Sequence, residues 1–161
     1  LFPALRIGYL VIPDPLVDSF RAAIRITGHT PPAAMQAALA DLIGEGHFGT
    51  HVRRMRTVYA GRRALMHNAL GGALGAFLEA CPGDGGMQIA SFLAPGADDR
   101  LAATAAAQAG IHTGALSAYY LGDRKPAGLY LGYAGVPDAD ISGAAQRLGV
   151  ALTSANTPKL R

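Results

Sequence analysis

The sequence predicts an α/β fold, in which short apolar strands alternate with amphipathic helices. Half of the 161 residues are hydrophobic, which is typical of a chain that forms a packed core rather than of a disordered segment. Apolar residues recur at helical spacing in the longer segments, whereas the short apolar runs between glycines and prolines have the length of strands. These observations together indicate helices and strands packed in layers.

The first part of the chain is predicted to contain one strand and two helices. The apolar run 7–12 ends at a proline, as a buried strand does at a turn. A helix is expected over 14–26, because a proline lies in its first turn and apolar residues follow at helical spacing. The segment 28–32 is interpreted as a loop, in which Thr30 caps a second helix that has Pro31 at its first position.

The remainder is predicted to hold a long helix followed by a small layered domain. An amphipathic helix is expected over 47–70, and the glycine-rich stretch 71–86 is interpreted as turns. The later elements are expected as a strand at 87–93, a helix at 98–109, strands at 111–115 and 129–133, and a helix at 138–148. This alternation is typical of an α/β layer domain.

Charge and cysteine content restrict the class of protein. The net charge of +3 comes from scattered arginines, which suits anion binding but does not form a continuous nucleic-acid surface. The single cysteine, Cys81, excludes a disulfide framework within the chain and fits a reducing compartment, so a cytoplasmic protein is expected. The apolar run 7–12 is too short to cross a membrane, and no membrane partner is expected.

The five histidines do not indicate a metal centre. His47 and His51 share a helical face, but no acidic residue follows at ligand spacing and there is no cysteine cluster. No metal ion is therefore expected.

Four segments carry a family resemblance: 1–11, 45–63, 116–120 and 128–135. The first, Leu-Phe-Pro-Ala-Leu-Arg-Ile-Gly-Tyr-Leu-Val, resembles the stretch that follows the cofactor-binding lysine of fold-type I aminotransferases, which use pyridoxal 5'-phosphate (PLP). The second resembles the long interdomain helix of that family. The last two resemble the C-terminal domain of MocR proteins, a subfamily of GntR-type transcription regulators.

The resemblance implies a domain organisation. Residues 1–45 correspond to the end of the large PLP-binding domain, 46–70 to the interdomain helix, and 71–161 to the small C-terminal α/β domain of the fold-type I aminotransferase fold. The lysine that binds PLP would fall just before Leu1, so the chain is expected to be a fragment with no catalytic residue of its own. Its cofactor, in the full-length parent, would be PLP.

The resemblance also implies partners. A MocR protein carries an N-terminal winged helix-turn-helix that binds DNA, so DNA, a second copy in a homodimer and an amino-compound effector are the implied partners. Two alternatives are a catalytic aminotransferase without a DNA-binding domain and an α/β fragment without any ligand. Many aminotransferases begin the strand equivalent to 129–133 with an arginine that clamps the substrate carboxylate, and here this strand follows Gly128, which weakens the case for ordinary transamination.

Three residues are candidates for ligand contacts. Arg6 is the expected cofactor-binding residue, because a guanidinium holds the dianionic phosphate of PLP through a planar fork, and the family places an arginine a few residues past the lysine. Thr30, beside His29, is a candidate substrate-binding residue because the family places the corresponding loop near the active site of the partner subunit, although a role as a helix cap is sufficient to account for it and is the favoured interpretation. Arg124 is the nearest replacement for the missing clamp, with a solvated loop as the alternative.

His51 and Arg62 fall on the apolar side of the predicted 47–70 helix. A charged side chain on such a face needs a partner or must extend to an edge. We expect polar groups of the absent large domain to contact them.

Overall fold

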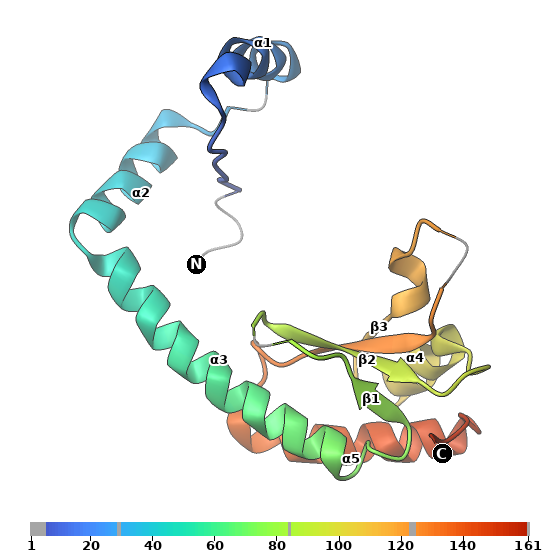
Figure 1. Cartoon of the computed structure of the whole chain (residues 1–161). Coiled ribbons are helices and arrows are strands. Elements are labelled where there is room, and N and C mark those ends of the chain that lie inside the picture. Colours follow the sequence, from blue (N-terminus) through green and yellow to red (C-terminus); the bar gives the residue numbers. More distant parts are fainter. Residues whose placement is uncertain (1–5, 29, 84, 123–124, 161) are drawn as a thin grey trace. The chain divides into compact units, whose positions relative to one another are not determined.

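The structure is a computed structural model that describes residues 6–28, 30–83, 85–122 and 125–160. The chain divides into two compact units, Leu1–Arg54 and Met55–Arg161, and the long helix α3 (His47–Gly71) runs from the first into the second (Figure 1). None of the helices in the described part of the chain combines the length and the apolarity that crossing a membrane requires.

The N-terminal unit consists of helices and connecting turns. A short 3₁₀ helix, η2 (Asp14–Leu16), leads into α1 (Val17–Thr27), and α2 (Ala33–Gly44) precedes α3. Helix α1 ends at Gly28, which has a φ of 67° and donates its N–H to the carbonyl of Ile24 at 3.0 Å. Glycine favours this left-handed position at a helix end. The helices predicted around 14–26 and 47–70 are confirmed.

The strand predicted at 7–12 is wrong. Residues 6–13 form neither strand nor helix, and the side chains of Tyr9 and Val11 are 89% and 90% exposed. A strand exists only where its N–H and C=O groups pair with a neighbouring strand. No described residue of the N-terminal unit belongs to a strand, so this apolar segment has no partner with which to form a ladder.

Four strands of the C-terminal unit form one antiparallel sheet in the order β1-β2-β4-β3. Their bounds are β1 (Leu78–Ala80), β2 (Gln88–Leu93), β3 (Gly114–Ala115) and β4 (Gly128–Gly132). A 3₁₀ helix, η3 (Leu116–Tyr119), follows β3. In the central pair, Ile89 lies opposite Leu131 and Ser91 opposite Leu129.

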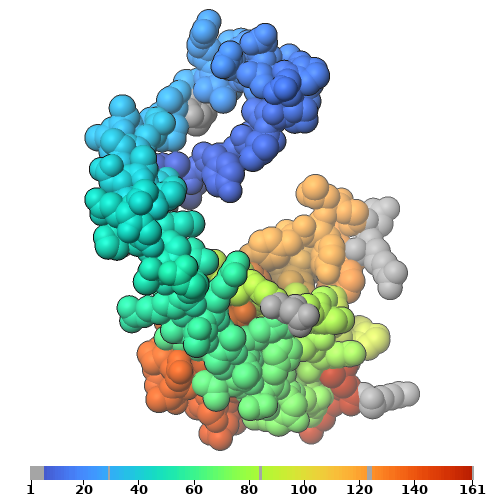
Figure 2. Space-filling view, turned by 60° about the vertical axis from the view of Figure 1, so that its left-hand side comes forward, coloured from blue at the N-terminus to red at the C-terminus, as the bar shows by residue number. Residues whose placement is uncertain are grey.

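Apolar side chains on one face of this sheet pack against three helices. Along β2 and β4 the residues alternate, so that Ile89, Leu93 and Leu131 are buried whereas Gln88 and Gly132 are exposed. The helices are the end of α3, α4 (Asp99–Gln108) and α5 (Asp138–Ser154). Figure 1 shows α5 running along the sheet, and Figure 2 shows the end of α3, in green, against α5, in orange-red. This core holds the C-terminal unit together.

Three further predictions for this unit need correction. The stretch 71–86 is not only turns, because it contains β1, whose Leu78 is buried in the core. The strand predicted at 111–115 is shortened at its beginning to β3, because only Gly114 and Ala115 pair with β4. The helix predicted at 138–148 continues to Ser154, because Leu148 and Leu152 lie one turn apart and both face the core.

Candidate functional site

Asp99 is a buried carboxylate at the start of α4. The preceding residue, Asp98, caps the helix by accepting hydrogen bonds from the N–H groups of Arg100 and Leu101 at 2.9 and 3.1 Å. Asp99 is only 3% exposed. It accepts the N–H and Oγ–H of Ser117 at 2.8 and 2.7 Å and the N–H of Gly128 at 3.1 Å. One carboxylate therefore joins α4 to η3 and to the first residue of β4.

The groups that donate hydrogen bonds to Asp99 favour its ionised form. Burial raises the pKa of this carboxyl, but the hydrogen bonds from Ser117 and Gly128, together with the positive charge of Arg100, outweigh burial. The pKa of Asp99 therefore lies below its ordinary value of 3.8, and the group is ionised at neutral pH. Gly128 is held tightly, since a Cβ there would lie 2.5 Å from the carbonyl oxygen of Ser91. The start of β4 is thus too closely packed for any residue larger than glycine.

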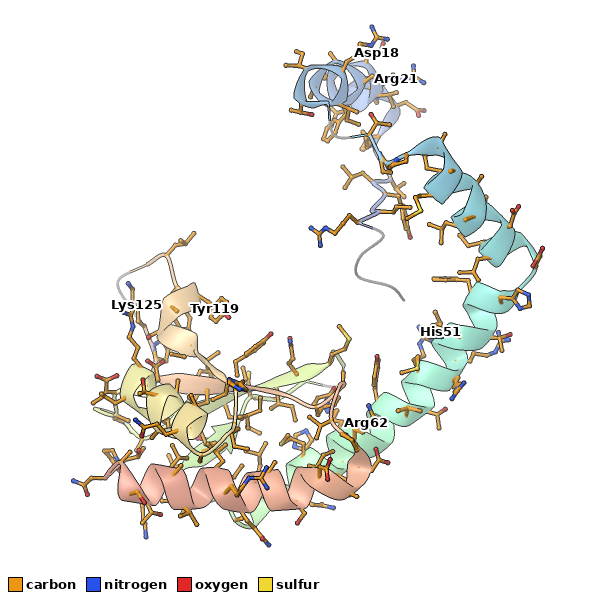
Figure 3. The ribbon with its side chains drawn as sticks, turned by 180° about the vertical axis from the view of Figure 1, so that it is seen from behind. Asp18, Arg21, His51, Arg62, Tyr119 and Lys125 are labelled. Atoms are coloured by element: carbon orange, nitrogen blue, oxygen red, sulfur yellow. The ribbon has the colours of Figure 1, made fainter. Side chains whose placement is uncertain are left out.

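A second group of contacts, formed by Gln88, Tyr119 and Tyr130, lies around β4. The rings of Tyr119 and Tyr130 have centroids 5.9 Å apart and are tilted by 44°. The side-chain amide of Gln88 donates to the Tyr130 hydroxyl, and Thr113 Oγ1 donates to the Tyr130 carbonyl at 2.7 Å. Tyr119 is 67% exposed and extends from the end of η3 (Figure 3). These side chains offer uncharged hydrogen-bonding groups and an aromatic surface.

Arg62 joins α3 to the start of α5. Its Nε donates to Asp138 Oδ1 at 2.9 Å, and its Nη1 donates to the carbonyl of Ala134. Figure 3 shows Arg62 where α3 passes the first turn of α5. The prediction that a charged residue on this face needs a partner is confirmed, but the partners belong to the C-terminal unit itself rather than to a large domain. His51 is exposed and needs no buried partner.

The predicted cofactor ligand, Arg6, is exposed in the structure. Its φ of 49° is in the left-handed region, which costs a non-glycine residue about 1–2 kcal/mol. No described residue forms a hydrogen bond or an ion pair with its guanidinium that would occupy it.

The predicted cap at Thr30 is wrong. Helix α2 begins at Ala33, its N-cap position is Pro32, and no side chain caps it. Pro32 has an extended conformation with a ψ of 138°, which moves the first helical residue beyond the reach of Thr30. Thr30 is exposed, so its hydroxyl is open to a ligand. Its neighbour His29 and the predicted substrate ligand Arg124 lie outside the described residues.

The structure places Arg6 and Thr30 in the same N-terminal unit, and neither belongs to the unit that carries β4. Sequence reasoning missed Asp99 and the cluster around Tyr130. The Asp98-Asp99 pair was a usable signal, because only the first of two consecutive aspartates can be the N-cap, and the second then lies in the first helical turn. Among the described residues, no group of three or more histidine, cysteine or acidic side chains could hold a metal ion.

Comparison with known proteins identifies the family of this chain. A family model described as aminotransferase class I and II matches residues 1–148. The chain is 39% identical over 136 residues to the probable rhizopine catabolism regulatory protein MocR of Rhizobium meliloti, covering 84% of the chain and 28% of that protein. It is 29% identical over 151 residues to the uncharacterized HTH-type transcriptional regulator YhdI of Bacillus subtilis (strain 168), covering 94% of the chain and 32% of that protein.

A solved structure shows the same fold. LysN, the alpha-aminoadipate aminotransferase of Thermus thermophilus complexed with N-(5'-phosphopyridoxyl)-L-leucine, matches with a TM-score of 0.87 and 22% identity, over 96% of this chain and 39% of that chain. The chain thus spans about a third of the length of the proteins it resembles. The predicted aminotransferase fold is confirmed, and because the family model extends from residue 1 to residue 148, this chain belongs to the aminotransferase class I and II family.

Proposed function

We propose that this chain is the C-terminal part of a PLP-binding, aminotransferase-like effector domain in a MocR-type transcription regulator. The observation that carries the proposal is the 39% identity with MocR across 84% of the chain. YhdI is also named as an HTH-type regulator. The likeness to LysN, at 22% identity, supports the fold but not an enzymatic role.

The proposed regulator uses the segments of this chain in three ways. Residues 1–45 complete the large PLP-binding domain, 46–70 connect the two domains, and 71–161 form the small domain. A winged helix-turn-helix that binds DNA and the lysine that holds PLP would precede Leu1. The protein would act in the cytoplasm as a homodimer with an amino compound as effector.

Strand β4 favours regulation over ordinary transamination. It reads Gly-Leu-Tyr-Leu-Gly, where many aminotransferases have an arginine for the substrate carboxylate. The side chains next to Tyr130 are Gln88 and Tyr119, which are both uncharged. The described side chains that contact Tyr130 therefore provide no fixed positive charge for an α-carboxylate.

The residues of this chain fit one part of a PLP site. Arg6 provides an exposed guanidinium that would hold the phosphate, in a strained backbone conformation of the kind that ligand-binding positions retain. PLP, when bound, supplies the carbonyl chemistry that captures primary amines. The lysines of the sequence, Lys125 and Lys159, both lie far from segment 1–11, which resembles the stretch after the cofactor-binding lysine. In the proposed protein the residues of this chain therefore bind and orient the cofactor without attaching it.

DNA binding by the full-length protein tests the proposal. The purified protein should select a defined sequence from a pool of random DNA, and PLP should change the affinity for that sequence in an electrophoretic mobility shift assay. The isolated chain Leu1–Arg161, used as the control, should not select DNA. A full-length protein that selects no sequence but transfers amino groups between amino acids and 2-oxo acids would instead be the catalytic aminotransferase.

Replacing Arg62 with leucine should separate PLP binding from the effect of PLP on DNA binding in the proposed regulator. The substitution removes the contacts that join α3 to Asp138 and Ala134, and a ligand can bias a regulator only through elements whose arrangement differs between its states. We expect PLP binding to persist, as measured by absorbance, while the PLP-dependent change in DNA affinity decreases. The exposed Arg56 on the same helix, replaced by leucine, is the control. If the mobility shifts of Arg62→Leu and wild type agree with and without PLP, helix α3 has only a structural role.

A further inference from the structure

A cavity of about 490 Å³ lies within the C-terminal unit, between α5, the end of α3 and the loop that leads into β3. It contains none of the residues discussed above as PLP or substrate ligands. Its floor is formed by core residues, among them Leu74, Leu131 and Leu148, which are at most 4% exposed. Its half-buried wall includes Met66, Ile111 and Val136. The inner surface is therefore apolar.

The cavity exists because α5 carries small residues where it faces the loop 110–113. Ala139, Gly143 and Ala144 line it, and none of them has a side chain that reaches across to Ile111. Larger residues at these positions would fill the space, as core packing otherwise does. An apolar hollow with a few polar groups at its edge is the usual form of a small-molecule site.

Two opposite charges stand at the edge of this cavity, and neither is paired with another residue that the structure describes. Arg147 extends back along α5, since a Cβ built at Gly143 would lie 3.7 Å from its Nη1. Asp140 lies one turn before Gly143, and positions three apart on a helix have Cβ atoms about 5–6 Å apart. No ion pair within 4.0 Å connects either residue to a described partner, whereas the neighbouring Asp138 is already engaged by Arg62.

Because Arg147 reaches back to Gly143 and Asp140 lies one turn before Gly143, both charges lie within reach of the head group of one bound amino acid. An α-carboxylate would pair with the guanidinium of Arg147 through two parallel hydrogen bonds, and the adjacent ammonium would pair with Asp140. An aliphatic side chain would then lie against Met66, Ile111 and Val136, where burial of apolar surface contributes to binding. His112, which also lines the cavity, is exposed and can donate a further hydrogen bond.

We propose that this cavity binds an α-amino acid with a branched aliphatic side chain, with Arg147 and Asp140 recognising its carboxylate and ammonium groups. None of the lining residues is one of the PLP or substrate candidates named above, and the binding activity does not depend on the proposed regulatory function. If the chain belongs to a regulator, occupancy of the site would be sensed at the start of α5, to which Arg62 attaches α3.

Calorimetric titration of the full chain with L-isoleucine, without PLP or DNA, tests this proposal. We expect saturable binding that weakens at least about tenfold in Arg147→Gln and in Asp140→Asn, because each loses charge-assisted hydrogen bonds. Ala144→Leu should prevent binding by filling the cavity. Arg56→Gln, an exposed arginine of α3 outside the cavity, should bind as the wild type does. Circular dichroism of each variant verifies the fold.

Two fragments of isoleucine make the test more specific. The first, 3-methylpentanoate, lacks the amino group and should lose the contact with Asp140. The second, 2-methylbutylamine, lacks the carboxyl group and should lose the contact with Arg147. Each should bind at least about tenfold more weakly than isoleucine. The proposal is overturned if isoleucine does not bind at millimolar concentration, if either fragment binds as tightly as isoleucine, or if the two charge substitutions leave its affinity unchanged.

Discussion

Replacing Asp99 with alanine should lower the free energy of unfolding of the C-terminal unit by about 3 kcal/mol. The buried carboxylate accepts three hydrogen bonds. Its removal leaves the N–H groups of Ser117 and Gly128 without an acceptor, and each unsatisfied buried group costs about 1–3 kcal/mol. Urea denaturation followed by circular dichroism measures the difference between variant and wild type.

Asp98 provides the matched control for this prediction. It is adjacent in sequence and carries the same charge, but it only caps α4, so Asp98→Ala should cost about 1 kcal/mol. A loss from Asp99→Ala no larger than that from Asp98→Ala would contradict the role of Asp99 in joining α4, η3 and β4.

The contribution of Asp99 should also depend on pH. Its pKa in the folded protein lies below the ordinary value of 3.8, so the stabilisation is fully present above about pH 4 and is lost as the pH falls through the folded-state pKa. The difference in unfolding free energy between wild type and Asp99→Asn should therefore be constant from neutral pH to about pH 4 and should shrink below it. A difference that grows in acid would contradict the assigned charge state.

The helices and the central strands were predictable because their patterns are local. The alternation of Ile89, Ser91 and Leu93 with more exposed residues, and the helical spacing in α1 and α3, follow directly from burial on one face. Strand β1 was not predictable in the same way. It is three residues long, lies next to glycines, and exists because it pairs with β2 across the loop, which is a tertiary interaction rather than a local one.

The candidate site was only partly predictable, for a similar reason. The periodicity of α3 correctly indicated that Arg62 needs a polar partner, but its partners Ala134 and Asp138 lie more than seventy residues away in sequence. The segment around Arg6 has the composition of a strand, but composition cannot supply the neighbouring strand that would complete a ladder. The role of Arg6 stays a prediction that rests on the family resemblance, on its exposure and on its backbone conformation.

Replacing Arg6 with alanine in the proposed full-length protein should weaken PLP binding by about a hundredfold. A bidentate guanidinium forms two charge-assisted hydrogen bonds with a phosphate, and losing them costs about 1.5 kcal/mol or more for each, which corresponds to this change in the dissociation constant. Titration of the cofactor-free protein with PLP, followed by absorbance, measures the effect.

Two further substitutions distinguish the planar guanidinium of Arg6 from a positive charge alone. Arg6→Lys keeps the positive charge but not the planar pair of donors, so its affinity should fall between those of wild type and Arg6→Ala. Arg25 lies in the last turn of α1 and is exposed, so Arg25→Ala should bind PLP as the wild type does. Because the strained φ of Arg6 is a property of the backbone, neither substitution at this position relieves it, and the comparison reports on the side chain alone. An unchanged PLP affinity in Arg6→Ala, or equal losses from Arg6→Ala and Arg25→Ala, would show that this arginine does not hold the phosphate.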